Sequence, residues 1–420
     1  DVYKRQTLYY MSGSEKIVTN ILIIYEFIEA TNIELDRVFG MLQKKGVLLR
    51  RFKTATKVYK DDLIWCDIML FVRSTSIIEF NLITLGRKMN KYIVLMLDDD
   101  LLSLDDSYGA IGQGYWGGRQ RILRKNLSQI NCLIAVNELL AKKYVKLGNI
   151  SKYVLLNTII EKSEMFSPQQ NSMNDNKVKI ALYVNDGTQN MFNEIIRPVI
   201  PMLCKYYAEQ VALYFIGLKP NMEEFKNKIE INYVSHMPYR DFKKKLGMSG
   251  FDIGLAPLVD TGFACYKYFN KYIEYTLAGI PAIYSDCLLY GLVIESGFNG
   301  LVCENNPVAW FKAISRLIEN PSLRRSLIDN AQFHIYDNFQ SEKILARLVK
   351  DMPELVGYKS KKNDVPFLTP RLRMMRLNYI IFKVRGWLYA AKNCIRKGNI
   401  MLLMRRIIRR IIKSVIKENR

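Results

Sequence analysis

Short apolar runs separated by helix-length segments recur along this chain, and this alternation constrains its fold more than any other feature. Apolar runs of strand length that alternate with helical patterns are typical of parallel strands joined by crossover helices. The first half therefore predicts one doubly wound α/β domain. Its expected elements are strands at 20–25, 67–72, 91–97 and 132–136, and helices at 33–45, at 75–88 and ending near 128.

A polar stretch at 167–177 interrupts this pattern, and its Ser, Pro, Gln and Asn content is typical of an interdomain linker. The alternation then starts again. The expected elements are strands at 178–184, 212–216, 252–256 and 282–284, a helix near 190–207 and a helix rich in lysine. We therefore predict an α/β fold of two Rossmann-like doubly wound domains that face a cleft.

These patterns place the first domain at 11–166, the linker at 167–177 and the second domain at 178–345, and leave 346–420 as a helical, basic and amphipathic tail. Ligands of open α/β sheets bind outside the carboxyl ends of the strands. We therefore expect the loops at 186–188, 217–220 and 257–266 to face the cleft.

The lysine-rich segment 267–285 is the strongest candidate for a binding site. On a helix its spacing places Lys267, Lys271 and Glu274 on one face, and Gly279 and Pro281 end that helix. A helix start is partly positive, so two lysines there are unfavourable without a bound anion such as phosphate, and Glu274 could accept hydrogen bonds from ribose hydroxyls. The alternative is an amphipathic surface helix with solvated lysines.

The composition excludes several other kinds of site. The chain has seven cysteines without a CxxC pair and only two histidines, so neither a disulfide framework nor a zinc centre is indicated, and we expect a reducing, cytoplasmic compartment. No apolar run reaches the roughly 18 residues that would cross a bilayer. Residues 1–10 precede the first methionine and lack a signal-peptide pattern, and we expect them to be a start-site artefact.

Further along, the second half resembles the donor domain of GT-B fold glycosyltransferases of the retaining, nucleotide-sugar-dependent type (group 1, family 4-like). The resemblance depends on several matches in register between about 178 and 339. They are the segment 251–258, the block Lys267-x3-Lys271-x2-Glu274-Tyr275-x3-Gly279-Ile-Pro281, the segment 297–302, Trp310 with Ala313 and Ile314, and Leu323-Arg324.

The resemblance implies donor-binding roles for particular residues. Glu274 would bind the ribose of the nucleotide, Lys267 and Lys271 would face its phosphates, and Gly187 with Thr188 would form a loop of close approach. Many relatives have a second Glu eight positions before the ribose Glu, and that position here is Tyr266, which we count among the candidate donor-binding residues. Lys219, after a strand and Gly217, is a further phosphate candidate, with a solvated lysine as the alternative.

The first half resembles acceptor domains less specifically, through Arg73 after a strand and through the junction at Asp98, Asp99 and Asp100. Arg73, Asp99 and Arg119 are candidates for acceptor contacts. The acidic triplet could be misread as the Asp-x-Asp metal motif of another glycosyltransferase class, but it lies in the half without the donor signature. The alternative for Asp99 and Asp100 is that they cap a turn.

The resemblance thus implies a hexosyltransferase-type enzyme that is retaining and metal-independent, uses a UDP- or GDP-sugar, requires no cofactor and acts in bacterial surface polysaccharide assembly. Without a metal, Lys267 and Lys271 would stabilise the leaving diphosphate. A catalytically inactive nucleotide-sugar-binding or scaffolding protein is the alternative, because of Tyr266. A nucleic-acid-binding protein is the third reading, but no base-stacking or groove-reading motif supports it.

The net charge of +22 is concentrated at the end of the chain, where 371–420 holds fifteen Lys or Arg residues and one acid, Glu418. In 401–417, apolar residues recur at helical spacing between cations, a pattern typical of helices that lie on anionic membranes. We therefore expect a protein that is peripheral on the inner face of the cell membrane and binds a glycan or lipid-linked acceptor there. A nucleic-acid-binding tail and a helix that packs on a partner protein are the alternatives.

Overall fold

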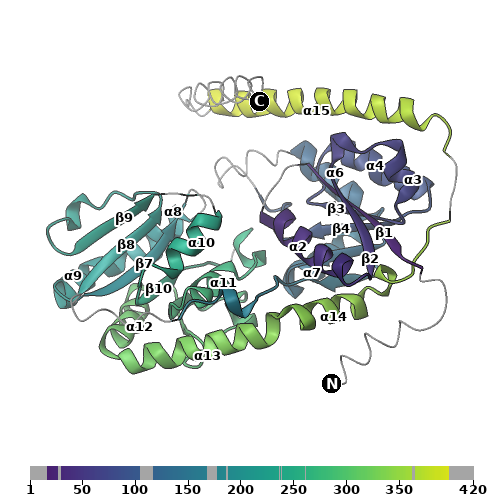
Figure 1. Cartoon of the computed structure of the whole chain (residues 1–420). Helices are drawn as coiled ribbons and strands as arrows, with labels where there is room; N and C mark the ends of the chain where they lie inside the picture. The colour runs from purple at the N-terminus through teal and green to yellow at the C-terminus, as the bar shows by residue number, and fades with distance from the viewer. Residues whose placement is uncertain are drawn as a thin grey trace.

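The computed structural model describes residues 17–26, 30–104, 117–167, 177–185, 188–235, 237, 239–260, 262–361 and 365–396. In this part of the chain the strands form two separate six-stranded sheets, and every neighbouring pair of strands is parallel. Helices flank both sheets (Figure 1). The predicted fold of two Rossmann-like domains, that of GT-B proteins, is confirmed.

The first sheet has the order β2-β1-β3-β4-β5-β6. Its central strands are mostly apolar and almost wholly buried, as expected for a parallel sheet that is covered on both faces. The strands are β1 (Thr19–Tyr25), β2 (Leu48–Thr54), β3 (Ile68–Val72), β4 (Tyr92–Leu97), β5 (Cys132–Ala135) and β6 (Tyr153–Leu155), and the helices are α2 (Ala30–Lys44), α3 (Lys60–Trp65), α4 (Ile77–Lys88), α6 (Gly117–Leu127) and α7 (Glu138–Gly148).

The second sheet has the order β12-β11-β10-β7-β8-β9, which is the Rossmann strand order. Its strands are β7 (Val178–Val184), β8 (Val211–Gly217), β9 (Glu230–Ser235), β10 (Ile253–Ala256), β11 (Ala282–Ser285) and β12 (Leu301–Cys303). Its helices are α8 (Gln189–Met191), α9 (Ile200–Tyr207), α10 (Tyr239–Gly247), α11 (Asn270–Leu277), α12 (Pro307–Glu319) and α13 (Pro321–Phe339). A π-helical turn and a 3-10 turn connect α8 to α9, so the helix expected near 190–207 is present.

After α13 the chain returns to the first domain. Helix α14 (Ser341–Asp351) contains the position at which we expected the second domain to end, and contacts β6. Beyond it, Glu354 pairs with Lys152 at 2.7 Å, and Lys359 pairs with Asp67 at 3.0 Å. Residues 352–361 therefore cover the edge of the first sheet where its strands begin.

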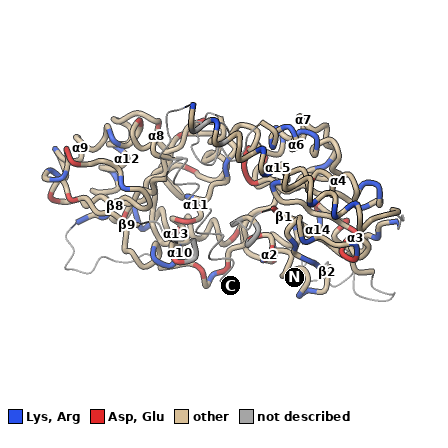
Figure 2. Tube along the Cα trace, turned by 90° about the horizontal axis from the view of Figure 1, so that it is seen from above, with Lys and Arg blue, Asp and Glu red and all other residues tan. Residues whose placement is uncertain are grey.

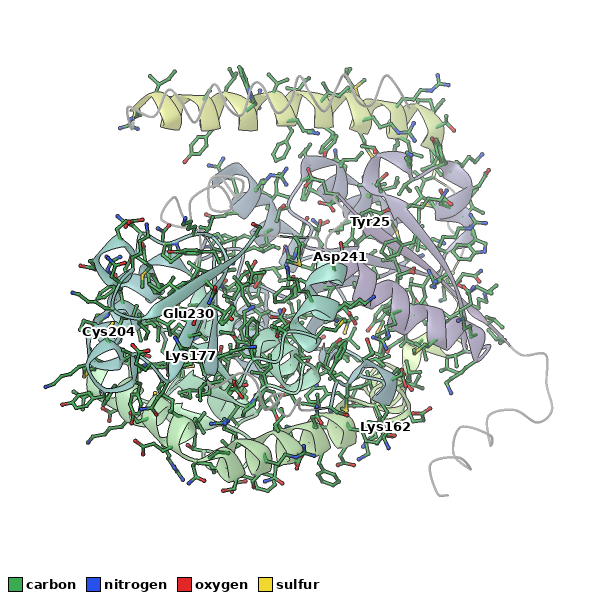
Figure 3. The ribbon with its side chains drawn as sticks, turned by 60° about the vertical axis from the view of Figure 1, so that its left-hand side comes forward. Tyr25, Lys162, Lys177, Cys204, Glu230 and Asp241 are labelled. Atoms are coloured by element: carbon green, nitrogen blue, oxygen red, sulfur yellow. The ribbon has the colours of Figure 1, made fainter. Side chains whose placement is uncertain are left out.

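Helix α15 (Leu368–Arg396) then lies against α3 and α4 of the first domain. Figure 1 shows it as a long yellow helix above that domain, and in Figure 3 Tyr25, the last residue of β1, lies beneath it. In the part of the chain that the structure describes, no helix is both long and apolar enough to cross a membrane. The segment 401–417, on which the sequence argument for membrane attachment depended, lies outside the described residues.

Each sheet has a point at which the strand order reverses, and these two points position the candidate site. In the second sheet β7 lies between β8 and β10, and in the first sheet β1 lies between β2 and β3. Open α/β sheets bind their ligands at such points, outside the carboxyl ends of the strands. The residues of interest are therefore those that follow β7 and β10 in one domain, and β1 and β3 in the other.

Candidate functional site

The loop between β10 and α11 leaves the reversal point of the second sheet and carries Tyr266 and Lys267. A short 3-10 turn, Ala264–Tyr266, is followed by Lys267 in an extended conformation, with φ −66° and ψ 164°. Helix α11 begins only at Asn270. The prediction that Lys267 shares a helical face with Lys271 and Glu274 is therefore wrong.

The reason for this later start lies in the two aromatic residues that precede the helix. Phe269 is buried, its ring lies 4.1 Å from that of Tyr268, and the Tyr268 hydroxyl donates to Asn157 of the segment that follows β6. Tyr268 is therefore fixed by a contact remote in sequence, and so is Phe269, whose ring packs edge-on against that of Phe339 at 5.9 Å. They fix the path of the chain ahead of α11 at the junction between the domains, where Lys267 is extended.

Lys271 and Glu274 do lie on one helical face, and they pair with each other. The Lys271 ammonium donates to a Glu274 carboxylate oxygen at 2.7 Å, and it lies 4.0 Å from the centre of the Tyr183 ring and 5.6 Å from that of Phe242. Glu274 is buried and Lys271 is half-buried. Glu274 thus supplies the anion that the sequence argument sought for Lys271, and the bond uses one of the three ammonium N–H groups.

Lys267 lies in the field of charges from both domains. Burial lowers its pKa, the negative charge of Asp99 in the first domain opposes this, and the positive charge of Lys271 lowers the pKa further. The Lys267 ammonium also lies 5.0 Å from the centre of the Phe263 ring. A partly desolvated ammonium is a strong partner for an anion, because little water must be removed when the anion binds.

The first domain holds this loop in place through α7. The Asn137 amide donates to the carbonyl oxygens of Lys267, at 2.9 Å, and Tyr266, at 3.3 Å, while its side-chain oxygen caps α7 by accepting from Leu140 N–H at 2.9 Å. The Lys143 ammonium, also on α7, lies 4.3 Å from the centre of the Tyr266 ring. One buried asparagine thus joins a helix start of the first domain to the backbone of the lysine loop.

Replacing Asn137 with Asp should lower kcat/KM about tenfold to hundredfold, because misplacement of a site loop by a fraction of an ångström is this costly. Asp caps a helix as well as Asn does, so α7 should stay intact while both donors to the loop are lost. Asn306→Asp is the matched control, since Asn306 caps α12 in the same way and its amide bonds only Glu304 among the described contacts. Unchanged kcat/KM in Asn137→Asp would contradict a positioning role.

The acceptor-side candidates Arg73 and Asp99 lie together after β3 and β4. The Arg73 guanidinium donates to Asp98 at 2.5 and 2.6 Å and to Asp99 at 2.9 Å. Burial acts to raise the pKa of Asp98, but the charge and hydrogen bonds of Arg73 outweigh it and hold that pKa below its ordinary value. Arg73 has a positive φ of 49°, which is rare for a side chain of this kind.

The third acid of the triplet, Asp100, has different partners. It is fully buried and accepts from Lys143 at 2.5 Å and from the Tyr144 hydroxyl at 2.9 Å. Among the described residues, no group of three or more His, Cys, Asp or Glu side chains is placed to hold a metal ion. The Asp98–Asp100 carboxylates instead bind basic and phenolic groups of their own domain.

Arg119, the remaining acceptor-side candidate, belongs to a different cluster at the reversal point of the first sheet. It pairs with Glu26, which follows β1, at 2.5 and 2.8 Å, and with the Thr75 hydroxyl, after β3, at 3.0 Å. From α15, the Tyr379 hydroxyl donates to Glu26 at 2.7 Å, and the Phe382 ring centre lies 5.5 Å from the Arg119 guanidinium. Arg119 is therefore engaged beneath α15 rather than beside the lysine loop.

The other donor-side candidates lie at the ends of β7 and β8. Gly187 is outside the described residues, and Thr188 closes a turn by accepting from Asn185 N–H at 2.9 Å. Gly217 has φ 103°, and a Cβ there would lie 2.5 Å from the Val184 carbonyl oxygen, so only glycine fits this close approach of two strand ends. Lys219 is exposed and lies 4.6 Å from the Tyr233 ring centre.

Sequence reasoning missed several residues that shape the site, namely Glu26, Asn137, Lys143, Tyr183, Phe242 and Tyr379. One of them carried a usable signal, because Asn137-Glu138 directly after a buried strand is typical of a helix N-terminus at the ligand-binding edge. The aromatic pair around Lys271 carried no such signal, because Tyr183 and Phe242 come from β7 and α10 and are far from Lys271 in the sequence. Figure 3 labels Asp241, which marks the first turn of α10 beside the first domain.

Two Rossmann-like domains joined in this way define a GT-B fold, and comparison with solved structures agrees. HepE of Anabaena, solved with UDP, is 12% identical with a TM-score of 0.55, and the match covers 80% of this chain and 100% of HepE. Sucrose-phosphate synthase of Thermosynechococcus elongatus is 13% identical with a TM-score of 0.58, and the match covers 80% of this chain and 99% of the synthase. The lipopolysaccharide outer core galactosyltransferase WaaB is 12% identical with a TM-score of 0.52, and the match covers 80% of this chain and 99% of WaaB.

The sequence family described as glycosyl transferases group 1 matches residues 182–320, the part of the chain that holds the lysine loop. The resemblance to GT-B glycosyltransferases of this group is thereby confirmed. No curated protein matches the sequence.

Proposed function

We propose that this protein is a glycosyltransferase that moves a sugar from a nucleotide sugar, a UDP- or GDP-sugar, to a glycan or lipid-linked acceptor in bacterial surface polysaccharide assembly. The observation that carries the proposal is the placement of Lys267, Lys271 and Glu274 at the reversal point of the donor-type sheet, within the matched family segment. The UDP complex of HepE and the lipopolysaccharide substrate class of WaaB support it.

In this mechanism the nucleotide lies at the carboxyl ends of β7 and β10. Glu274 accepts hydrogen bonds from the ribose hydroxyls, while the two remaining Lys271 N–H groups and the Lys267 ammonium face the diphosphate. Negative charge grows on the departing diphosphate in the transition state, and preorganised cations stabilise it most when water is excluded. Protein cations in this role make the reaction metal-independent, and retention of the anomeric configuration follows the family resemblance.

The acceptor would approach from the first domain, where Asp99 and Arg73 face the lysine loop. We place the enzyme on the inner face of the cell membrane, with the basic segment 371–420 as the contact, so that a lipid-linked acceptor lies within reach. A cytoplasmic side is consistent with the supply of nucleotide sugars. Nucleic acid is not part of this proposal.

A test of the donor site is calorimetric titration of UDP, GDP, ADP and CMP into the full chain and into Lys271→Met, without added metal. We expect micromolar binding of one nucleoside diphosphate and at least about a tenfold weaker affinity in Lys271→Met, because a charge-assisted contact to phosphate is lost. Lys226→Met, which removes an exposed lysine of the same domain, is the matched control. If none of the four nucleotides binds, the donor site is refuted.

A nucleotide-sugar-binding protein without transfer activity is the second candidate, and one observation favours it. Tyr266 stands where many relatives have Glu, and its ring is covered by Lys143, so the loop offers no carboxylate at that position. This candidate predicts nucleotide binding of normal strength with no release of nucleoside diphosphate from a bound nucleotide sugar. The same protein preparation can therefore separate the two functions.

A further inference from the structure

Helix α15 has an apolar face that points away from the domain it covers. Its members are between 47% and 60% exposed. The first five recur every three or four residues and the sixth follows two turns later, so they form one stripe along the helix. They are Met374, Leu377, Ile381, Val384, Leu388 and Ile395. We call this set the outward stripe.

The opposite face of the same helix is buried against the first domain. Leu372, Tyr379 and Phe382 are each less than 10% exposed, and the Arg376 guanidinium donates to the Val58 carbonyl oxygen at 3.0 Å. A helix that only covers its own domain needs one apolar face, with polar residues on the other. The outward stripe is therefore not explained by packing within this domain.

Cations flank the outward stripe, and acids are absent from the helix. The exposed residues beside the stripe include Arg371, Arg373, Arg385, Lys392 and Arg396, whereas the sequence of Leu368–Arg396 contains no Asp or Glu. Figure 2 shows Lys and Arg along α15 and on the neighbouring α4 and α6. The occupant of this face must therefore be apolar at its centre and anionic at its rim.

This charge pattern distinguishes an anionic lipid surface from a second copy of the chain. The stripe spacing of three and four residues also suits a coiled coil, but two copies of α15 would place Arg and Lys against Arg and Lys at the flanking positions, with no acid to pair them. Acyl chains and anionic headgroups meet both requirements. At about 1.5 Å per residue, the outward stripe offers a contact roughly 30 Å long.

We propose that the outward stripe lies in an anionic lipid surface and that α15 fixes the first domain to that surface with the carboxyl edge of its sheet turned toward the lipid. The orientation follows from the contacts of Tyr379 with Glu26 and of Phe382 with Arg119, because Glu26 directly follows β1 and Arg119 begins α6 beside it. The benefit to a lipid-linked acceptor depends on the proposed function. The binding surface itself does not.

The test is co-sedimentation of the full chain with vesicles of neutral phosphatidylcholine, alone or with anionic phosphatidylglycerol. We expect binding only to the anionic vesicles, reduced by salt, and at least about a tenfold weaker partition for Leu377→Gln/Ile381→Gln/Val384→Gln, since burial of each apolar side chain is lost. The matched control is Leu147→Gln/Val308→Gln/Phe333→Gln, three exposed apolar residues on α7, α12 and α13. The control should bind as the wild type does.

Equal partition of the stripe variant and the wild type would overturn the proposal, as would equal binding to neutral and anionic vesicles. A wild-type dimer in sedimentation velocity that becomes a monomer in the stripe variant, with vesicle binding unchanged, would assign the face to a second copy instead. Calorimetric nucleotide titration of the same variants tests the proposed donor site separately from the proposed lipid surface. Vesicle binding that depends on the stripe in a protein that binds none of the four nucleotides would refute the proposed donor site and support the lipid surface.

Discussion

Replacing Lys267 and Lys271 together with Met is expected to lower kcat by at least about 1,000-fold, since each well-placed cation at a developing anion contributes about 2 to 4 kcal/mol. Both ammonium groups bind the diphosphate more strongly as its charge grows, so the effect should appear in kcat more than in KM. The measurement is the rate of nucleoside diphosphate release at saturating nucleotide sugar, with a membrane extract as the source of acceptor.

The folded structure should survive this change because Met retains most of the aliphatic length of Lys. At position 271 it can still pack against the Tyr183 and Phe242 rings, which the lysine already contacts. The change leaves buried Glu274 without its ion-pair partner. A second variant, Lys271→Met/Glu274→Gln, removes this unpaired charge as well. A double lysine variant that unfolds at the wild-type temperature and retains a normal rate would refute the assignment.

The control for the loss of two positive charges is Lys226→Met/Lys312→Met. Both residues lie exposed on the same domain, so the net charge changes equally while the lysine loop is untouched. We expect this control to turn over at the wild-type rate. A comparable loss in the control would show that net charge, through attraction of an anionic membrane or substrate, explains the effect.

The central strands of both sheets could be predicted from the sequence because they are buried on both faces and read as continuous apolar runs. The runs expected at 67–72 and 178–184, for example, correspond to β3 and β7. All four edge strands, β2, β6, β9 and β12, were missed. Two of them, β2 and β9, contain charged or polar residues, as in Leu48–Thr54 with its two arginines and a lysine, and β6 and β12 are only three residues long. Local pattern carries little signal at such edges.

The location of the site could be predicted from the sequence, but the contacts between its side chains could not. The block that contains Lys271 and Glu274 marked the donor loop, yet the extended conformation of Lys267 depends on Asn137, Asn157 and the aromatic pair at 268 and 269. In the same way, the return of α14 and α15 to the first domain depends on the Lys152–Glu354 and Glu26–Tyr379 contacts. These contacts join residues far apart in sequence, which periodicity does not reveal.

The structure also contains a buried acid whose protonation should make stability depend on pH. Glu79, near the start of α4, is fully buried, and one of its oxygens accepts from the backbone N–H groups of Thr75 and Ser76 and from the Ser76 hydroxyl. Its other oxygen has no partner among the described residues. The pKa of Glu79 is raised to about 8, because burial and the charge of Glu26 raise it by more than the Ser76 hydrogen bonds and the charge of Arg119 lower it.

The sign of the effect follows from the difference between the folded and unfolded states. In the unfolded chain a Glu carboxyl ionises near pH 4.5, whereas in the folded protein Glu79 stays protonated until about pH 8. The unfolded state therefore binds fewer protons than the folded state between these pH values, and the contribution of Glu79 to stability falls as the pH rises. It is fully present below about pH 4.5 and is lost by about pH 8.

Glu79→Gln should remove this dependence, because a glutamine resembles the protonated acid at every pH. We expect the free energy of unfolding of the variant, relative to wild type, to rise by roughly 3 to 5 kcal/mol between pH 4.5 and pH 8.5, at about 1.4 kcal/mol for each unit of pKa shift. The measurement is urea unfolding of both proteins across this range. Glu138→Gln, on the exposed face of α7, is the control and should leave the pH profile unchanged.

The side chains that face Glu79 come from three other elements of the structure. Glu26, Arg119 and Tyr379 come from the end of β1, from α6 and from α15, so the acid senses whether α15 is docked on the first domain. If Glu79→Gln and wild type show the same pH profile, Glu79 is ionised in the folded protein and Arg119 compensates its charge. If the profiles diverge as expected, Glu79 is neutral at pH 7, and Glu26 is the carboxylate that pairs with Arg119 and accepts from Tyr379.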